Sequence, residues 1–179
     1  MRIAIIGAHR VGKTTLAEKL HECLTDYELK AEPYYALEGL GYGFSEKPNV
    51  DDFVEQLDYS IKQILTSGDN VIFDRCPIDI LAYIQALDTI GNIESIYHKV
   101  QSIVTEIDLL VFVPIERPDL IPRHESDLLN LRYQVNEILN DCMGIFSIET
   151  IEVTGTLSNR CDQVLGKISH ELSGNRPIG

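Results

Sequence analysis

A glycine-rich segment near the N-terminus has the residue types and spacing of a phosphate-binding loop. It reads Gly7-Ala8-His9-Arg10-Val11-Gly12-Lys13-Thr14 and is followed by Thr15. The glycines let successive backbone N–H groups converge on a polyphosphate, Lys13 can reach its terminal phosphates, and Thr14 can hold Mg²⁺. An apolar run before the segment and helical periodicity after it supply the strand and helix that this P-loop motif requires. We therefore expect residues 7–15 to bind a polyphosphate together with Mg²⁺.

A charged pair, Asp74-Arg75, directly follows the apolar run of residues 71–73. An aspartate at this place can coordinate Mg²⁺ directly or through water, and the arginine can offer a planar fork of donors to a phosphate. The alternative is a structural ion pair that caps a strand. In a chain with a P-loop the site interpretation is favoured, with Asp74 as the second metal ligand beside Thr14.

Glu32 ends a weaker apolar segment that follows the first predicted helix. A carboxylate at this place would face the terminal phosphate across that helix, where it can accept a proton from a substrate hydroxyl. Because the chain has 28 Asp and Glu residues, an acid that lies near the site by chance is an equally good explanation. Glu32 is our expected catalytic base.

Three arginines lie on or near a proline-punctuated segment after the fourth predicted strand: Arg117, Arg123 and Arg132. They can form a small lid, at about residues 114–132, that neutralises the charge spreading over a transferred phosphoryl group. For any single arginine, an ordinary salt bridge to a neighbouring acid is the alternative. Three cations near one loop, in a chain with only 15 Lys and Arg, favour the lid.

Two further sets of residues are candidates for contact with a ligand. Gly155 follows the fifth predicted strand, where it can let the backbone approach an adenine ring or simply allow a positive-φ turn. Four tyrosines are expected to form an aromatic wall for a planar acceptor, although Tyr59 fits a core position equally well. They are Tyr34, Tyr35, Tyr42 and Tyr59.

Length and charge exclude several classes of protein. The 179 residues favour one domain, residues 1–172, with a short polar tail at 173–179. A net charge of −13 opposes binding to duplex nucleic acid or to an anionic membrane surface. No apolar run is long enough for a membrane helix, and four scattered cysteines indicate a reduced, cytoplasmic protein. The sequence leaves the oligomeric state open.

Alternating strand and helix patterns predict an α/β fold with a five-stranded parallel sheet and helices on both faces. Strands are expected at 3–6, 29–32, 71–73, 109–113 and 148–153. Helices are expected near 13–25, 50–67, 78–89, 94–105, 125–141 and 158–172, with N-caps at Asn49 or Asp51 and at Ser158. Residues 33–48 are expected to form an ordered loop beside the site. Ligands of such sheets bind beyond the carboxyl ends of the strands, where the candidate residues lie.

Taken together, the chain resembles the small P-loop kinases, in particular the AAA-type ATPase/kinase family that includes the nicotinamide-riboside kinase domain. The resemblance lies in residues 7–15, Glu32, the segment VIFDRCPIDILAY at 71–83, residues 131–139, and VTGT with Arg160 near the end. Glu32-Pro33 and Asp74-Arg75 are also similar to deoxynucleoside and thymidylate kinases. The resemblance implies the three-layer P-loop nucleoside triphosphate hydrolase fold.

The function that we expect is ATP- and Mg²⁺-dependent phosphoryl transfer to a small metabolite, a nucleoside or nucleotide-like acceptor. A signalling GTPase is disfavoured because the chain lacks an NKxD motif, and the third strand ends in DRCP rather than DxxG. The alternative is an ATP-binding regulatory protein or ATPase, in which the P-loop senses ATP and a partner reads the position of the lid.

Overall fold

A parallel five-stranded sheet lies at the centre of the computed structural model, which describes residues 1–87, 93–116 and 128–174. The strands are β1 (Arg2–Ile6), β2 (Glu28–Lys30), β3 (Val71–Asp74), β4 (Leu109–Phe112) and β5 (Glu149–Glu152), in the spatial order β2-β3-β1-β4-β5. Strand β1 is central and pairs with β3 and β4, and residues 3–6 are fully buried. The expected five-stranded parallel sheet is confirmed.

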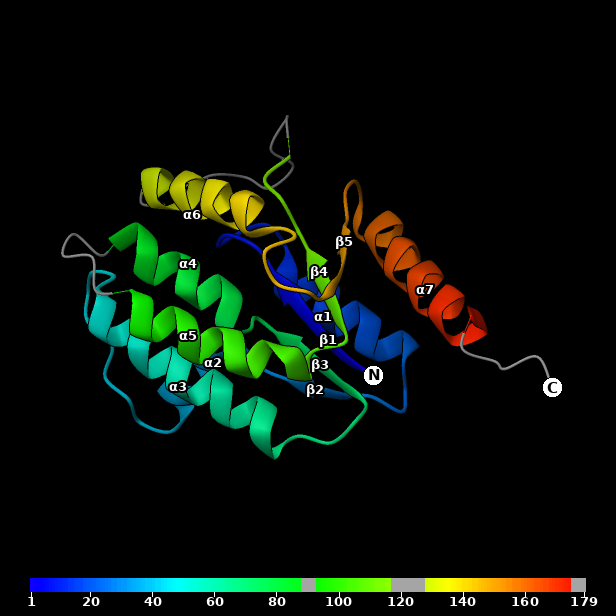
Figure 1. The fold of residues 1–179 in the computed structure, drawn as a ribbon, viewed down its shortest axis with the longest axis horizontal. Coiled ribbons are helices and arrows are strands. Elements are labelled where there is room, and N and C mark those ends of the chain that lie inside the picture. The colour runs from blue at the N-terminus through cyan, green and yellow to red at the C-terminus, as the bar shows by residue number, and fades with distance from the viewer. Residues whose placement is uncertain (88–92, 117–127, 175–179) are drawn as a thin grey trace.

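Helices cover both faces of this sheet (Figure 1). On one face α1 (Lys13–Cys23) packs against α7 (Leu157–Gly174). The other face carries α3 (Val50–Thr66), α4 (Pro77–Leu87), α5 (Glu94–Ile103) and α6 (Leu129–Cys142). The short α2 (Pro33–Gly39) packs on α3, and a 3₁₀ turn (Val104–Glu106) follows α5. Within the described ranges, none of these helices is both long and apolar enough to cross a membrane.

The segment from residue 33 to residue 48 differs from the expected loop, because its first half is helical. Helix α2 begins at Pro33, whose fixed φ suits the first turn of a helix. The helix ends before Gly41, which adopts a φ of 91°. The glycines and aromatic residues of the whole segment concealed a seven-residue helical stretch. A related correction concerns Glu32, which lies beyond the end of β2 and is the N-cap residue of α2.

The two expected helix caps have different outcomes. Asn49 is confirmed as the N-cap of α3, where its side-chain oxygen accepts a hydrogen bond from the Asp52 amide at 2.9 Å. Ser158 is not a cap, because α7 already begins at Leu157. The hydroxyl of Thr156 instead accepts from the amide of Asn159 at 3.3 Å. Helix α7 also runs to Gly174, past the expected end at residue 172.

These caps give a direct test of the fold. Replacing Asn49 with alanine should lower the free energy of unfolding by about 1 kcal/mol, because the amide of Asp52 loses its acceptor. Ser158→Ala is the matched control and should change that free energy by less than about 0.5 kcal/mol. Urea unfolding followed by circular dichroism measures both. Equal losses in the two variants would show that α3 and α7 begin elsewhere.

Candidate functional site

The P-loop joins β1 to α1 in a backbone shape that requires glycine at its ends. Gly7 has a φ of 152°, and a Cβ there would lie 2.4 Å from the carbonyl oxygen of Val113. Gly12 has a φ of 92° and is the N-cap residue of α1. Between them Arg10 adopts a left-handed φ of 57°, which costs a non-glycine residue ~1–3 kcal/mol. Alternation between right- and left-handed residues makes a concave anion site of backbone N–H groups.

Two arginines from the C-terminal half of the chain bind the carbonyl groups of this loop. Arg132 of α6 donates from Nε to the carbonyl of His9 at 2.9 Å and from a terminal nitrogen to that of Arg10 at 3.1 Å. Arg160 of α7 donates to the carbonyl of Val11 at 2.7 Å. A hydrogen bond from a charged group contributes ~1.5–3 kcal/mol. These bonds therefore offset the strain at Arg10.

Lys13 is the first residue of α1, and its side chain is 5% exposed. Its ammonium donates to the carbonyl of Ala8, on the opposite side of the P-loop, at 2.9 Å. Burial lowers the pKa of this amine and so does the charge of Arg75, whereas nearby carboxylates, led by Glu32, raise it. The loop thus holds a buried ammonium group, and a bound polyphosphate can replace the Ala8 carbonyl as the hydrogen-bond acceptor of Lys13.

The carboxylate of Asp74 lies beside the side chain of Thr14 at the start of α1. Asp74 is the last residue of β3 and is 3% exposed. Burial raises the pKa of its carboxyl, while hydrogen bonding to the Thr14 side chain and the charge of Lys13 lower it. Its Oδ1 is buried and has no hydrogen-bond partner among the described residues. A spare oxygen beside a hydroxyl fits Mg²⁺, which binds one or two protein oxygens and completes its shell with water and phosphate.

Arg75 turns away from the strand and is buried among acids. Its φ is 79°, and its guanidinium is 2.9 Å from Oε1 of Glu32 and 3.7 Å from Oδ2 of Asp79. Burial lowers the pKa of Arg75, but the charges of Glu32 and Asp79 raise it above the ordinary value. Its Nε and one terminal nitrogen lack hydrogen-bond partners within the described part of the chain. The terminal nitrogen in question is the one that lies 3.7 Å from Asp79, so its contact with that carboxylate is an ion pair without a hydrogen bond.

Glu32 lies at the start of α2, and 15% of its side chain is exposed. Burial raises the pKa of its carboxyl, but the charges of Arg75 and Lys13 and the hydrogen bond from Arg75 outweigh this effect. The pKa of Glu32 therefore lies below its ordinary value. An ionised carboxylate that lines a pocket and lies near the P-loop lysine can accept a hydrogen bond from a ligand hydroxyl.

Asp79 is a site residue that the sequence analysis missed. Its side chain is fully buried, and Oδ1 accepts from the amide of Cys76 at 2.9 Å, which caps α4. Burial raises the pKa of its carboxyl to about 7, against the lowering effect of Arg75 and Lys13. The only signal in the sequence is an acid in the first turn of the helix that follows Asp74-Arg75, a capping position.

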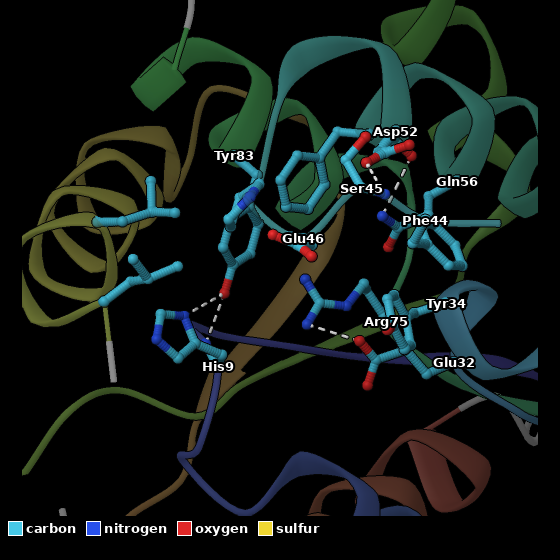
Figure 2. A pocket seen from close by; sticks show the side chains of 14 residues that line it. His9, Glu32, Tyr34, Phe44, Ser45, Glu46, Asp52, Gln56, Arg75 and Tyr83 are labelled. Atoms are coloured by element: carbon cyan, nitrogen blue, oxygen red, sulfur yellow. Dashed lines mark hydrogen bonds and ion pairs between the residues drawn. The ribbon is translucent and has the colours of Figure 1, made fainter. Parts of the chain in front are cut away.

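Tyr83, which sequence reasoning did not assign a role, connects the P-loop to the neighbouring pocket (Figure 2). Its hydroxyl accepts from the His9 amide at 2.6 Å and lies 3.0 Å from His9 Nδ1. Its ring stacks on Phe53 with centroids 4.8 Å apart and lies 4.9 Å from the guanidinium carbon of Arg75. Burial raises the pKa of this phenol, so it stays neutral. Its i, i+4 spacing from Asp79 places both on one face of α4.

A pocket of 330 Å³ opens beside the P-loop, at the lower end of the roughly 300–1,000 Å³ range of small-molecule sites. Glu32, Arg75 and His9 line it together with residues of α3, α4 and α6. Figure 2 shows Tyr83 on one side of Arg75 and Tyr34 with Phe44 on the other. The rings of Tyr34 and Phe44 are stacked, with centroids 4.2 Å apart. Aromatic rings on two sides suit a planar ligand.

The aromatic wall differs from the expected one. Of the four tyrosines only Tyr34 lines this pocket. Tyr35 is 59% exposed, and Tyr42 donates to Asp52 at 3.1 Å. Tyr59 is half-buried outside the lining. The other aromatic lining residues are Phe44, Phe53 and Tyr83, which sequence reasoning missed because the pocket forms only when α3 packs on α4.

The remaining expected site residues have mixed outcomes. Arg117 and Arg123 lie outside the described residues, as does most of the expected lid. Thr15 is exposed in the first turn of α1. Gly155 has a φ of 90°, which supports the turn interpretation. Its amide donates to Glu116 at 2.6 Å.

Solved structures share this fold at low sequence identity. Deoxyadenosine kinase from M. mycoides is 16% identical, with a TM-score of 0.67 over 96% of this chain and 100% of that one. Thymidylate kinase from Ehrlichia chaffeensis is 14% identical, with a TM-score of 0.70 over 94% and 98%. NadR protein is 17% identical, with a TM-score of 0.69 over 99% of this chain and 53% of that one.

Sequence comparison assigns the family. A search of curated proteins gave no significant match. The profile of one family, described as the AAA domain, matches residues 2–160. This match covers most of the chain, and the structural relatives have the P-loop kinase-like fold. The chain therefore belongs to the AAA domain family.

Proposed function

We propose that the protein transfers the terminal phosphoryl group of ATP to a hydroxyl of a small nucleoside or nucleotide-like acceptor. The observation that carries this proposal is the position of Glu32, an ionised carboxylate that lines a small aromatic pocket and lies near the P-loop lysine. The structural relatives support the class of acceptor. One is a deoxyadenosine kinase with dCMP bound, and another is NadR in complex with NR.

Each side of the cleft has its own task in this proposal. On the donor side, Lys13 and the P-loop amides bind the phosphates of ATP, in keeping with related structures that contain dATP and AMP-PNP. Thr14 and Asp74 would hold Mg²⁺, which would neutralise phosphate charge. The acceptor hydroxyl gives its proton to Glu32 as its oxygen bonds to the terminal phosphorus, and the bond from that phosphorus to ADP breaks.

Arg75 has two tasks on the acceptor side. Its bond to Glu32 orients the carboxylate and keeps it ionised. Its guanidinium lines the pocket and can bind phosphate oxygens as charge spreads over the transferred group. Arg117 and Arg123 remain proposed lid residues. Arg132, the third expected lid arginine, donates to the carbonyl groups of His9 and Arg10, so its proposed effect on the phosphates is exerted through the loop.

The decisive test is ADP production with a panel of nucleosides, nicotinamide riboside and nucleoside monophosphates. At least one acceptor should raise turnover well above the rate with ATP alone. Glu32→Gln should lower kcat for that acceptor by about 10²–10⁴-fold, because the proton acceptor is lost. Glu38→Gln, an exposed acid on the same helix, is the control. If no acceptor stimulates turnover, the protein is an ATPase or an ATP-binding regulator instead.

The metal ligands give a second prediction. Activity should vanish when EDTA removes the metal, and Asp74→Asn should raise the Mg²⁺ concentration for half-maximal rate by more than about tenfold. The loss follows because the substitution removes the negative charge of a carboxylate whose Oδ1 has no hydrogen-bond partner among the described residues. Asp69→Asn changes an exposed acid just before β3 and should leave the Mg²⁺ titration unaltered. An unchanged titration in Asp74→Asn would rule out Asp74 as a metal ligand.

A further inference from the structure

The carbonyl groups of three successive P-loop residues are bound by two buried arginines. Arg132 is 2% exposed and donates to His9 and Arg10, and Arg160 is 7% exposed and donates to Val11. A guanidinium has its donors in one rigid plane, so a bond to a carbonyl fixes the direction of the attached peptide. We propose that Arg132 and Arg160 are positioning residues that set the shape of the phosphate-binding loop through its carbonyl groups.

The shape of the loop explains why such bonds are needed. Arg10 has a left-handed φ of 57° without being glycine, so its conformation must be held by contacts around it. The two bonds from Arg132 fall on the carbonyls of Arg10 and of the residue before it. A peptide that turned over would aim its carbonyl oxygen where an N–H group should meet a phosphate. The arginine keeps both oxygens bound and so opposes this rotation.

Arg160 links the loop to the segments that follow β4 and β5. Its other terminal nitrogen donates to Oε1 of Glu116 at 2.9 Å, and the same oxygen accepts from the amide of Gly155 at 2.6 Å. The carboxylate, the guanidinium and the turn before α7 thus form one partly buried network that ends on the carbonyl of Val11. The last helix therefore takes part in the nucleotide site although sequence reasoning gave Arg160 no task of its own.

Binding of inorganic tripolyphosphate, with Mg²⁺, isolates the loop from the rest of the nucleotide site. In Arg132→Lys and Arg160→Lys the charge is kept, but the planar fork is lost. We expect the Kd for tripolyphosphate, measured by calorimetry, to rise by about tenfold or more in both, because small displacements of a binding group have large effects. Arg132→Met and Arg160→Met should bind no more tightly than the lysine variants.

Arg2→Met is the matched control, because Arg2 also donates to two backbone carbonyls, those of Ser67 and Gly68, at the opposite end of the sheet. This variant should bind tripolyphosphate like wild type even if it unfolds at a lower temperature. All variants are compared at a temperature at which circular dichroism shows them folded, so a purely structural role would not change the Kd.

The inference rests on one part of the proposed function, the binding of the donor phosphates by the P-loop. The experiment separates a failure of the inference from a failure of the proposed kinase activity. Wild-type affinity in both lysine variants would show that charge alone matters and would overturn the positioning role. An equal loss of tripolyphosphate affinity in Arg2→Met and in the Arg132 and Arg160 variants would overturn the positioning role as well. If wild type fails to bind tripolyphosphate, the donor site and this inference both fail. Binding by wild type without any acceptor-dependent turnover would leave the inference intact and remove only the kinase assignment.

Discussion

The guanidinium of Arg75, buried between the carboxylates of Glu32 and Asp79, connects the parts of the site. It joins the end of β3 to the start of α2 and to the first turn of α4. Removing one partner of a buried ion pair typically costs about 3–5 kcal/mol, because the remaining charge is left uncompensated. The same cation lowers the pKa of Glu32, so the proposed base is ionised because the network is intact. The stability of the fold and the ionisation of Glu32 therefore depend on the same contacts of Arg75.

The parallel sheet explains how these residues come together. Asp74 pairs in register with Ile5, two residues before the P-loop begins, so both strands deliver their polar ends to one edge. Tyr83 then bridges the two sides, since its hydroxyl meets the His9 amide while its ring lines the pocket. Tyr83 therefore contacts both the pocket proposed for the acceptor and the loop proposed for the phosphates.

The sequence predicted those features that depend on residues close together along the chain. The P-loop spacing and the apolar strand runs predicted the fold. The search for polar residues after strand ends selected Asp74, Arg75 and Glu32, which the structure places close to the P-loop lysine. The sequence did not predict those features that depend on contacts between segments far apart along the chain. Phe53 and Tyr83 sit on helices whose periodicity looks like ordinary packing, and only the contact of α3 with α4 makes them part of the pocket wall. Asp79 looks like an ordinary capping residue, and only its ion pair with Arg75 brings it to the site. The role of Arg160 depends on a contact with Val11, far away in the sequence.

In the proposed reaction Glu32 meets the acceptor hydroxyl while the P-loop holds the donor. A crystal structure with ADP, Mg²⁺ and the acceptor selected by turnover measures this most directly. We expect an acceptor hydroxyl at about 3 Å from a Glu32 oxygen, with the ring of the acceptor between the aromatic side chains of the pocket. An acceptor bound elsewhere, with Glu32 contacting only Arg75, would contradict it.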